Sequence, residues 1–411
     1  MATGKTRLIV FDVEGVLIPK NRFFFEVGKS LGFFKLVYIL CAGFLYEAGI
    51  LSLESALQRV FNKLKGVKIE LLITLFEKIP ATPHLQNFFA QIKQRNCKIA
   101  LISSGLPTVI VKKLANIIGA DYAYGIEVGL NDKDELTGDI SGDAIGLNGK
   151  LKILHQILSA EGLTLHDCIV VADDRNNRCI FLPETKKIGY DPDFIIRVKA
   201  DEVVAGRLSG ILPVIDGKRV KRSFPSRNDL VREDIHASGF FVPVIASLIG
   251  VPAVALLICF VAGVYIISEL SRLDDRELPL ISAITRHAAS QSELYGFVAA
   301  PLYFALGILL TLLIFPAQVS GAAIAIFALG DSAASIFGGL IGKRLPFNKG
   351  KTLEGSLAGF FFAFLAGTFF VAPWIALIGA AVAMLIEYLP LPVNDNVLIP
   401  VLTGLALMLL V

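Results

Sequence analysis

Hydrophobic and polar residues are distributed differently in the two halves of this chain. In residues 1–235 short apolar runs alternate with charged stretches, whereas residues 236–411 consist largely of long apolar runs separated by short loops. The first pattern is typical of a soluble α/β domain and the second of helices that cross a membrane. We therefore expect a soluble domain over residues 1–215, a basic juxtamembrane linker over 216–235 and a polytopic all-α membrane domain over 236–411.

Three short apolar runs in the soluble half predict buried parallel strands, at residues 7–11, 99–102 and 168–171. Polar residues follow each run, namely Asp12 and Glu14, Ser103 and Ser104, and Asp173 and Asp174. Any one of these groups is equally compatible with an ordinary turn. Because the carboxyl ends of parallel strands form the ligand-binding edge of an open α/β sheet, the three groups together indicate a functional site.

With Lys150, these residues make the soluble half resemble the haloacid dehalogenase (HAD) superfamily, and within it the phosphoserine phosphatase-like branch, over roughly residues 7–200. The resemblance implies a Rossmann-like α/β domain, a helical cap at about residues 20–82 and a Mg²⁺-dependent phosphatase. It assigns five roles: Asp12 as nucleophile and metal ligand, Glu14 as general acid, Ser103 as phosphate ligand, Lys150 as the cation that neutralises developing charge, and Asp173 as metal ligand.

The soluble half also departs from this family's pattern. Glu14 stands where the family usually has Asp, Asn177 where it has a second acid, and Ala172 where it has Gly. Two hypotheses follow, an active phosphatase or a non-catalytic regulatory domain. In the cap, Asn21 replaces the glutamate that reads the substrate amine, so phosphoserine is not the expected substrate. The apolar cap either has its own small core or faces lipid or an apolar substrate.

The second half predicts about seven membrane spans. The run 237–270 is broken at Gly250 and Pro252 and is interpreted as a hairpin of two short spans. The remaining spans are expected at 297–315, 319–341, 355–372, 374–390 and 397–411. This count places the basic linker and the charged loops on one side, which the positive-inside rule makes cytoplasmic. We therefore expect a multi-pass membrane protein whose soluble domain lies in the cytoplasm. The fusion of these two domains suggests that the membrane is that of a prokaryotic cell.

One aspartate, Asp331, interrupts an apolar segment near mid-span. Ionisable groups at membrane depth are costly and usually mark function, so Asp331 is a candidate site residue. The half as a whole resembles the CTP-dependent lipid-alcohol kinases, which include dolichol, phytol and yeast-type diacylglycerol kinases and are related to phosphatidate cytidylyltransferases. The matching residues are Arg232, His236, Gly239, Glu269, Arg272, 330–332, 351–356, Glu387, Pro392, Asp395, Asn396 and Pro400.

This second resemblance implies Mg²⁺ and CTP as co-substrate. Candidate Mg²⁺ ligands are Asp331, Glu354, Glu387 and Asp395. Candidate ligands of the triphosphate are Lys343, Arg344, Lys349, Lys351 and Ser356. Asp331 is also the candidate for holding the acceptor hydroxyl, and Ser332, Asn396 and His236 are further site candidates. Simpler roles stay open: the basic loop could only fix topology, Ser332 and Asn396 could cap helices, Glu387 could extend to the interface and His236 could be a satisfied interfacial histidine.

We expect a bifunctional membrane enzyme in which the second half phosphorylates a polyprenol-like lipid alcohol from CTP and the first half is a Mg²⁺-dependent phosphatase. Three alternatives remain open: cytidylyl transfer to a lipid phosphate, a kinase with a regulatory HAD domain, and a transporter. The expected partners are the lipid alcohol, CTP and membrane lipids. The net charge of +3 is too small to indicate nucleic acid.

Overall fold

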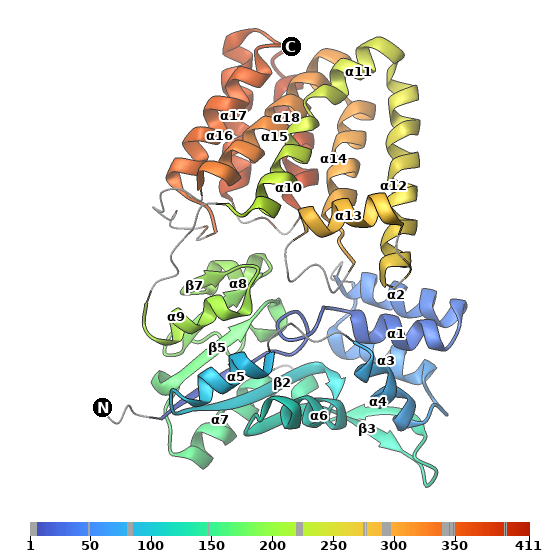
Figure 1. Ribbon diagram of the computed structural model, residues 1–411, viewed down its shortest axis with the longest axis vertical. Coiled ribbons are helices and arrows are strands. Elements are labelled where there is room, and N and C mark those ends of the chain that lie inside the picture. Colours follow the sequence, from blue (N-terminus) through green and yellow to red (C-terminus); the bar gives the residue numbers. More distant parts are fainter. Residues whose placement is uncertain are drawn as a thin grey trace. The chain divides into compact units, whose positions relative to one another are not determined.

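The computed structural model describes residues 6–47, 50–79, 85–146, 148–218, 225–273, 276, 278–289, 297–338, 345, 348, 350–389, 391 and 393–411. The chain divides into two compact units, Met1–Val220 and Lys221–Val411. In Figure 1 the first unit contains the sheet and the second consists of helices.

A seven-stranded sheet in the order β4-β3-β2-β1-β5-β6-β7 forms the centre of the first unit. All neighbouring strands are parallel except β3 and β4. The strands are β1 Arg7–Phe11, β2 Cys97–Pro107, β3 Tyr122–Leu130, β4 Leu136–Ser141, β5 Cys168–Ala172, β6 Lys186–Tyr190 and β7 Glu202–Val204. β2 continues to Pro107, so Ser103 lies within this strand and not after it. The central strands contain apolar runs, at residues 8–11, 99–102 and 168–172, as is typical where both faces of a sheet are covered.

Successive residues of β1 point to opposite faces of the sheet and enter two separate cores. Ile9 and Phe11 pack with α5 (Leu85–Lys93), α6 (Thr108–Ile118) and α9 (Ile211–Ile215). On the other face, Leu8 and Val10 pack with α7 (Gly149–Glu161) and α8 (Phe194–Lys199). The strand ends that carry Asp12 and Asp173 are therefore fixed from both sides.

Four helices between β1 and α5 form the cap, namely α1 (Arg22–Ser30), α2 (Phe33–Glu47), α3 (Leu53–Lys63) and α4 (Ile69–Glu77). Phe23 and Phe61 are fully buried within it. The outer face of α2 is different, because Phe33, Phe34 and Phe44 are between 71% and 88% exposed. The two buried cap residues belong to the same hydrophobic core as Ile9 and Phe11, so among the described residues the cap does not form the separate small core expected from its sequence. The cap also presents an apolar surface.

The second unit contains nine helices in the described part of the chain. They are α10 Arg227–Ser238, α11 Phe241–Ile249, α12 Val251–Leu273, α13 Pro279–Ala288, α14 Ala300–Ile314, α15 Ala317–Gly338, α16 Leu353–Gly367, α17 Pro373–Tyr388 and α18 Asp395–Met408. Gly250, at φ 89°, separates α11 from α12, at the break expected from its sequence. Part of the expected linker is helical, because Ser226 and Asp229 form a capping box that starts α10.

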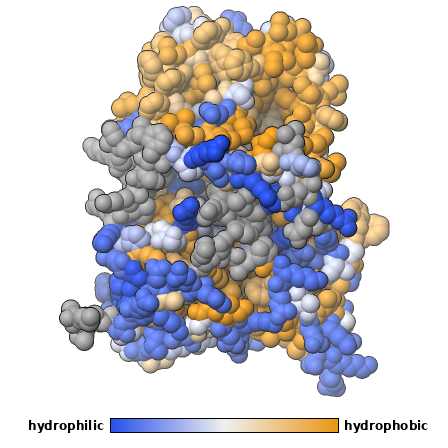
Figure 2. Space-filling model, in the orientation of Figure 1, coloured by the Kyte–Doolittle hydropathy of each residue, from blue (hydrophilic) through white to orange (hydrophobic). Residues whose placement is uncertain are grey.

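Two of these helices, α12 and α15, are long and apolar enough to cross a membrane, and α14, α16, α17 and α18 are shorter apolar helices. The expected seven spans therefore stay a prediction. Figure 2 shows hydrophobic residues over most of the visible face of the helical unit, whereas hydrophilic residues are frequent on that of the first unit. α15 is the central helix of its unit, and small residues let its neighbours approach closely: a Cβ on Gly355 would lie 2.6 Å from the carbonyl oxygen of Ala334.

Candidate functional site

Asp12 stands immediately after β1 and is buried against Lys150. The backbone N–H of Val13 donates to Asp12 Oδ1 at 2.8 Å, and Lys150 Nζ lies 3.1 Å from the same oxygen. Lys150, in the first turn of α7, is 2% exposed. Burial raises the pKa of Asp12, and the charge of Lys150 opposes this rise. A carboxylate held in one orientation next to a buried cation is suited to nucleophilic attack on an electrophilic centre.

Asn177 completes a buried network with these two residues. It accepts a 2.7 Å hydrogen bond from Lys150 Nζ at its Oδ1, and its Nδ2 donates to Asp12 and, at 3.1 Å, to Asp174 Oδ1. An aspartate at this position could not donate to Asp12 when ionised. The departure from the family's motif therefore leaves Asp12 hydrogen-bonded and removes one negative charge from the site.

Asp12, Asp173 and Asp174 each offer a carboxylate oxygen within 4.8 Å of the others. Burial, followed by the charges of Asp174 and Asp12, raises the pKa of Asp173 well above its ordinary value. Among the described residues Asp173 Oδ1 has no hydrogen-bond partner although it is buried. Such an orphaned oxygen beside two other carboxylates fits a hard divalent cation such as Mg²⁺. Asp174 has no counterpart in the motif, so only its position after β5 could have indicated its part in this cluster.

Ser103 and Glu14 flank the same cluster. Ser103 Oγ is buried and accepts from the backbone N–H groups of Gly105 and Leu106 at 3.2 and 3.0 Å, which leaves its own proton free to be donated. Burial, together with the charges of Asp12 and Asp174, raises the pKa of Glu14 to about 8. A carboxyl group whose pKa is raised in this way can donate a proton near neutral pH.

Two glycines are required by this packing. A Cβ on Gly105 would lie 2.1 Å from Glu14 Oε2, and a Cβ on Gly15 would lie 2.0 Å from Asp173 Oδ2. Gly15 also has φ +83°, a conformation that residues with a Cβ rarely adopt. Glycine at these two positions lets the carboxyl groups of Glu14 and Asp173 approach the backbone closely.

The cap is attached to the loop after β5. Tyr46, at the end of α2, donates from its hydroxyl to Asn176 Oδ1 at 2.7 Å, and Arg175 donates to the Tyr46 carbonyl at 2.6 Å. The Arg175 guanidinium also lies over the Tyr46 ring, 4.7 Å from its centroid. These contacts connect the cap with the segment that carries Asp174 and Asn177.

A second polar cluster surrounds Asp331 in α15 of the helical unit. Asp331 Oδ2 lies 3.6 Å from His236 Nδ1, and Asp331 Oδ1 lies 3.9 Å from Lys351 Nζ. Lys351 Nζ also contacts Glu387 Oε1 at 2.6 Å. Burial lowers the pKa of Lys351, but the charges of Glu387 and Asp331 raise it, and the pKa lies above its ordinary value. The structure thus brings together residues from α10, α15, α17 and the segment before α16.

Glu233 was not predicted from the sequence and belongs to this cluster. It is 4% exposed, and with His236 and Asp331 it forms a group of potential metal ligands within 4.8 Å. Ser332 Oγ donates a 3.0 Å hydrogen bond to the backbone carbonyl of Glu233. Ser332 therefore joins α15 to α10 instead of capping a helix. The sequence offered little indication of a role for Glu233, because this residue lies in a strongly charged stretch of the kind that is usually exposed to solvent.

The other predicted residues of this half lie around the cluster or outside the described residues. Lys343, Arg344 and Lys349 are outside them. Glu354 and Ser356 lie in the first turns of α16 and are partly exposed. Asp395 begins α18 and acts electrostatically on Lys351. Asn394, and not Asn396, caps that helix, because its side chain accepts from the Asn396 backbone N–H.

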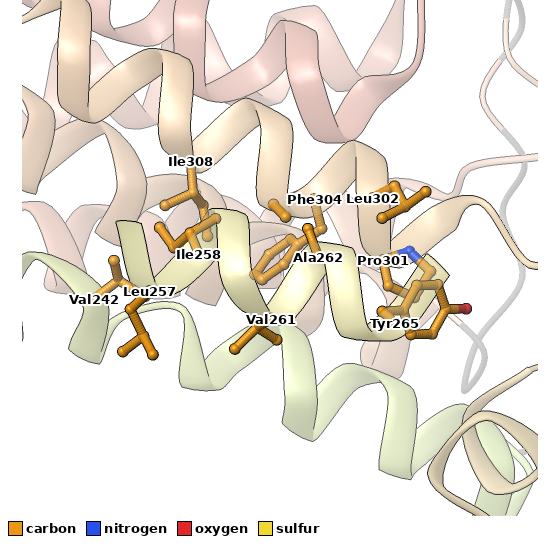
Figure 3. Close-up of a pocket in the computed structure, with 11 residues that line it drawn as sticks. Val242, Leu257, Ile258, Val261, Ala262, Tyr265, Pro301, Leu302, Phe304 and Ile308 are labelled. Carbon is orange, nitrogen blue, oxygen red and sulfur yellow. The ribbon is translucent and has the colours of Figure 1, made fainter. Parts of the chain in front are cut away.

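An apolar cavity of about 290 Å³ lies beside this cluster. Figure 3 shows its lining side chains, which come from α11, α12 and α14 and include Val242, Leu257, Tyr265 and Phe304. Phe304 also stacks on the ring of His236, with centroids 4.5 Å apart and an interplanar angle of 24°. The same aromatic side chain thus borders both the cavity and the polar cluster.

Residues 9–176 match the family model described as haloacid dehalogenase-like hydrolase. A phosphoserine phosphatase of Methanocaldococcus jannaschii is 29% identical over 205 residues, which cover 49% of this chain and 94% of that protein. A phosphoserine phosphatase of Archaeoglobus fulgidus is 27% identical over 195 residues, covering 47% of this chain and 55% of that protein.

A solved structure of a phospho-aspartyl intermediate analogue of phosphoserine phosphatase is 27% identical, with a TM-score of 0.47, and covers 51% of this chain and 99% of that chain. The family match ends at residue 176 and does not reach the helical unit. The N-terminal unit is a haloacid dehalogenase-like domain of the phosphoserine phosphatase type.

Proposed function

We propose that the N-terminal domain hydrolyses a phosphate monoester with Asp12 as the nucleophile. The observation that carries this proposal is the convergence of Asp12, Lys150 and the carboxylates of Asp173 and Asp174 at the end of two neighbouring strands. Mg²⁺, for which these three carboxylates are suitable ligands, would neutralise charge on the phosphoryl group.

The chain's own residues account for both halves of the reaction. A carboxylate oxygen of Asp12 attacks phosphorus, the ester P–O bond breaks, and the protonated Glu14 gives its proton to the leaving alkoxide. Glu14 then takes a proton from water, whose oxygen attacks the phosphoaspartyl group and releases inorganic phosphate and free Asp12. Lys150 and Ser103 donate hydrogen bonds to the phosphoryl oxygens as charge develops on them.

The position of Asp174 favours an active enzyme over a regulatory domain. Asn177 removes the family's second acid, but Asp174 supplies a carboxylate three residues earlier in the chain and contacts Asn177 directly. The number of carboxylates available for the cation is therefore maintained. A regulatory domain would have no need for the orphaned Asp173 oxygen, whose burial without a partner is costly.

We propose an apolar alcohol phosphate, and not phosphoserine, as the substrate class. Asn21 is an exposed, uncharged residue at the start of α1 and cannot neutralise an ammonium group. The cap helix α2 exposes Phe33, Phe34 and Phe44, which fits approach to a lipid surface. Phosphate release by the detergent-purified full chain from alkyl, isoprenyl and amino-acid phosphates tests both parts, with Asp12→Asn as the control. Release from phosphoserine alone contradicts the substrate class, and release that is equal in Asp12→Asn contradicts the mechanism.

A second candidate function, for the helical unit, is CTP-dependent phosphorylation of a lipid alcohol within a membrane. α12 supports a membrane location, since Leu256, Phe260 and Ile267 are 73%, 68% and 60% exposed. The apolar cavity next to His236 would accept a lipid chain, and Lys351 would bind a phosphate. Cytidylyl transfer to a lipid phosphate is the rival reaction.

Product analysis with labelled CTP separates these reactions. Membranes containing the full chain are incubated with polyprenol, phytol or diacylglycerol acceptors. Formation of CDP and a phosphorylated lipid supports the kinase, and formation of pyrophosphate with a CDP-lipid supports cytidylyl transfer. An Asp12→Asn protein is used so that the N-terminal domain does not hydrolyse the product. If neither a phosphorylated lipid nor a CDP-lipid is formed by this protein, the second candidate function is contradicted.

A further inference from the structure

α10 and α15 bring three metal-ligating side chains together at one place in the helical unit. Glu233 and His236 are three residues apart, so they lie on the same face of α10. Asp331 faces them from α15, and one donor atom of each residue lies within 4.8 Å of the other two. Two donors bound to one ion at about 2 Å are about 3 to 4 Å apart. Only a small side-chain movement is therefore needed for all three to reach one ion.

A second observation indicates that this cluster has a ligand. Glu233 is 96% buried, since its exposed fraction is 4%, and its Oε2 has no hydrogen-bond partner among the described residues. Its other oxygen, Oε1, lies 3.3 Å from the Arg232 guanidinium. His236 Nδ1 is also buried without a hydrogen bond in the described part of the chain. Leaving such atoms unsatisfied costs stability, and a bound cation would satisfy both of them.

The charges around the cluster favour a cation over an anion. The carboxylates of Glu233, Asp331 and Glu387 face the cations Arg232 and Lys351, which leaves an excess of one negative charge. Lys351 is closest to Glu387, at 2.6 Å, and stands 3.9 Å from Asp331. Neither Glu233 nor Asp331 is therefore fully neutralised by its neighbours.

We infer that Glu233, His236 and Asp331 bind a divalent transition-metal ion. One imidazole nitrogen and two carboxylate oxygens suit Mn²⁺, Zn²⁺ or Fe²⁺ better than Mg²⁺, which prefers oxygen ligands only. Phe304 stacks on His236 and holds its ring in place, and the Ser332 hydrogen bond to the Glu233 carbonyl fixes α10 against α15. Because metal binding is measured without CTP or lipid, the inference does not rest on the proposed phosphotransfer.

Mn²⁺ binding to the full chain in detergent tests this site. Asp12→Asn with Asp173→Asn removes two of the three carboxylates of the N-terminal cluster, so the Mn²⁺ that remains bound reports the helical unit. We expect one Mn²⁺ per chain in this background, and at least a 10-fold loss of affinity on adding Glu233→Gln. The matched control is Asp234→Asn, the exposed neighbouring acid on the same helix, which should leave Mn²⁺ binding unchanged. Fluorescence of Trp374, in α17, reports whether each variant remains folded.

Pulsed electron paramagnetic resonance provides a readout that needs no variant. The described ligands of the N-terminal cluster are all oxygen atoms, so modulation from a directly bound ¹⁴N should come from His236. We expect this modulation in the Mn²⁺-loaded background protein and its loss in His236→Gln. The inference is overturned if the folded background protein binds no Mn²⁺, if its bound Mn²⁺ shows no ¹⁴N coupling, or if Glu233→Gln and Asp234→Asn bind Mn²⁺ equally.

Discussion

Asn177 accepts a 2.7 Å hydrogen bond from Lys150, and both side chains are buried at the end of β5 and the start of α7. An amide at this place orients the lysine without adding a negative charge. The charge of Lys150 therefore remains directed at Asp12, 3.1 Å away. Asp174, whose Oδ1 accepts a 3.1 Å hydrogen bond from the same amide, adds a carboxylate beside the position where the family has its second acid.

Moving the carboxylate from position 174 to position 177 should restore the family's pattern of metal ligands. We expect Asp174→Asn to raise the Mg²⁺ concentration for half-maximal phosphatase activity by on the order of 10-fold, because one of three carboxylates is lost. Adding Asn177→Asp to that variant should recover much of the loss. Magnesium titrations of phosphate release measure both effects, and an Asp174→Asn enzyme with unchanged Mg²⁺ dependence would exclude Asp174 as a ligand.

Replacement of Glu14 should affect substrates according to their leaving group. Glu14→Gln cannot donate a proton, so hydrolysis of an alkyl phosphate should fall by about 10² to 10⁴-fold. Formation of the phosphoaspartyl group from an aryl phosphate should fall much less, because a phenolate leaves without assistance. Rapid-quench measurement of the first turnover compares the two, and equal losses would contradict the general-acid role.

The pH dependence of the alkyl phosphate reaction follows from the same residue. Glu14 must be protonated to act as the acid, and its pKa is raised to about 8, so kcat/KM should fall as the pH rises through 8. If Asp12 and Asp174 hold Mg²⁺, their negative charge would be neutralised and the pKa of Glu14 lowered, which would move this limb to lower pH and not to higher pH. A profile that stays flat up to pH 10 with the wild-type enzyme, measured at saturating Mg²⁺, would contradict the assignment.

The contacts of Tyr46 should hold the cap closed. Tyr46→Phe removes the hydroxyl that donates to Asn176 but keeps the ring beneath Arg175. A single hydrogen bond contributes about 0.5 to 1.5 kcal/mol, so local opening of α2 should become about 2- to 10-fold more frequent. Hydrogen exchange of α2 amides measures this, with β1 amides as the internal control, and unchanged exchange in α2 would show that Tyr46 does not restrain the cap.

Much of the N-terminal site could be predicted because its residues follow apolar strands in a recognisable order. Asp12 and Asp173 needed only the rule that parallel strand ends share one edge of the sheet. Asp174 was recognised as a polar residue after its strand but was given no role, because the motif has no acid there. Glu233 was missed because its burial depends on the packing of α10 against α15, which local charge does not reveal. The contact of Lys351 with Glu387, 36 residues apart, likewise depends on tertiary packing.

Asp331 should be required for the activity of the helical unit and not for that of the N-terminal domain. If it holds the acceptor hydroxyl or a cation, Asp331→Asn should lower CTP-dependent lipid phosphorylation by on the order of 10²-fold, comparable to losing a preorganised electrostatic group. Phosphate release by the N-terminal domain of the same variant should be unchanged. Near-normal lipid phosphorylation by a correctly inserted Asp331→Asn protein would remove Asp331 from the proposed chemistry.

Acid-quenched labelling shows whether Asp12 becomes covalently phosphorylated during turnover. The full chain is mixed with a ³²P-labelled phosphate monoester and Mg²⁺, quenched within milliseconds and digested for mass spectrometry. We expect label on the peptide that contains Asp12, none in Asp12→Asn, and release of inorganic phosphate only from the wild type. Label on another residue, or phosphate release by Asp12→Asn at the wild-type rate, would contradict the role of Asp12 as nucleophile.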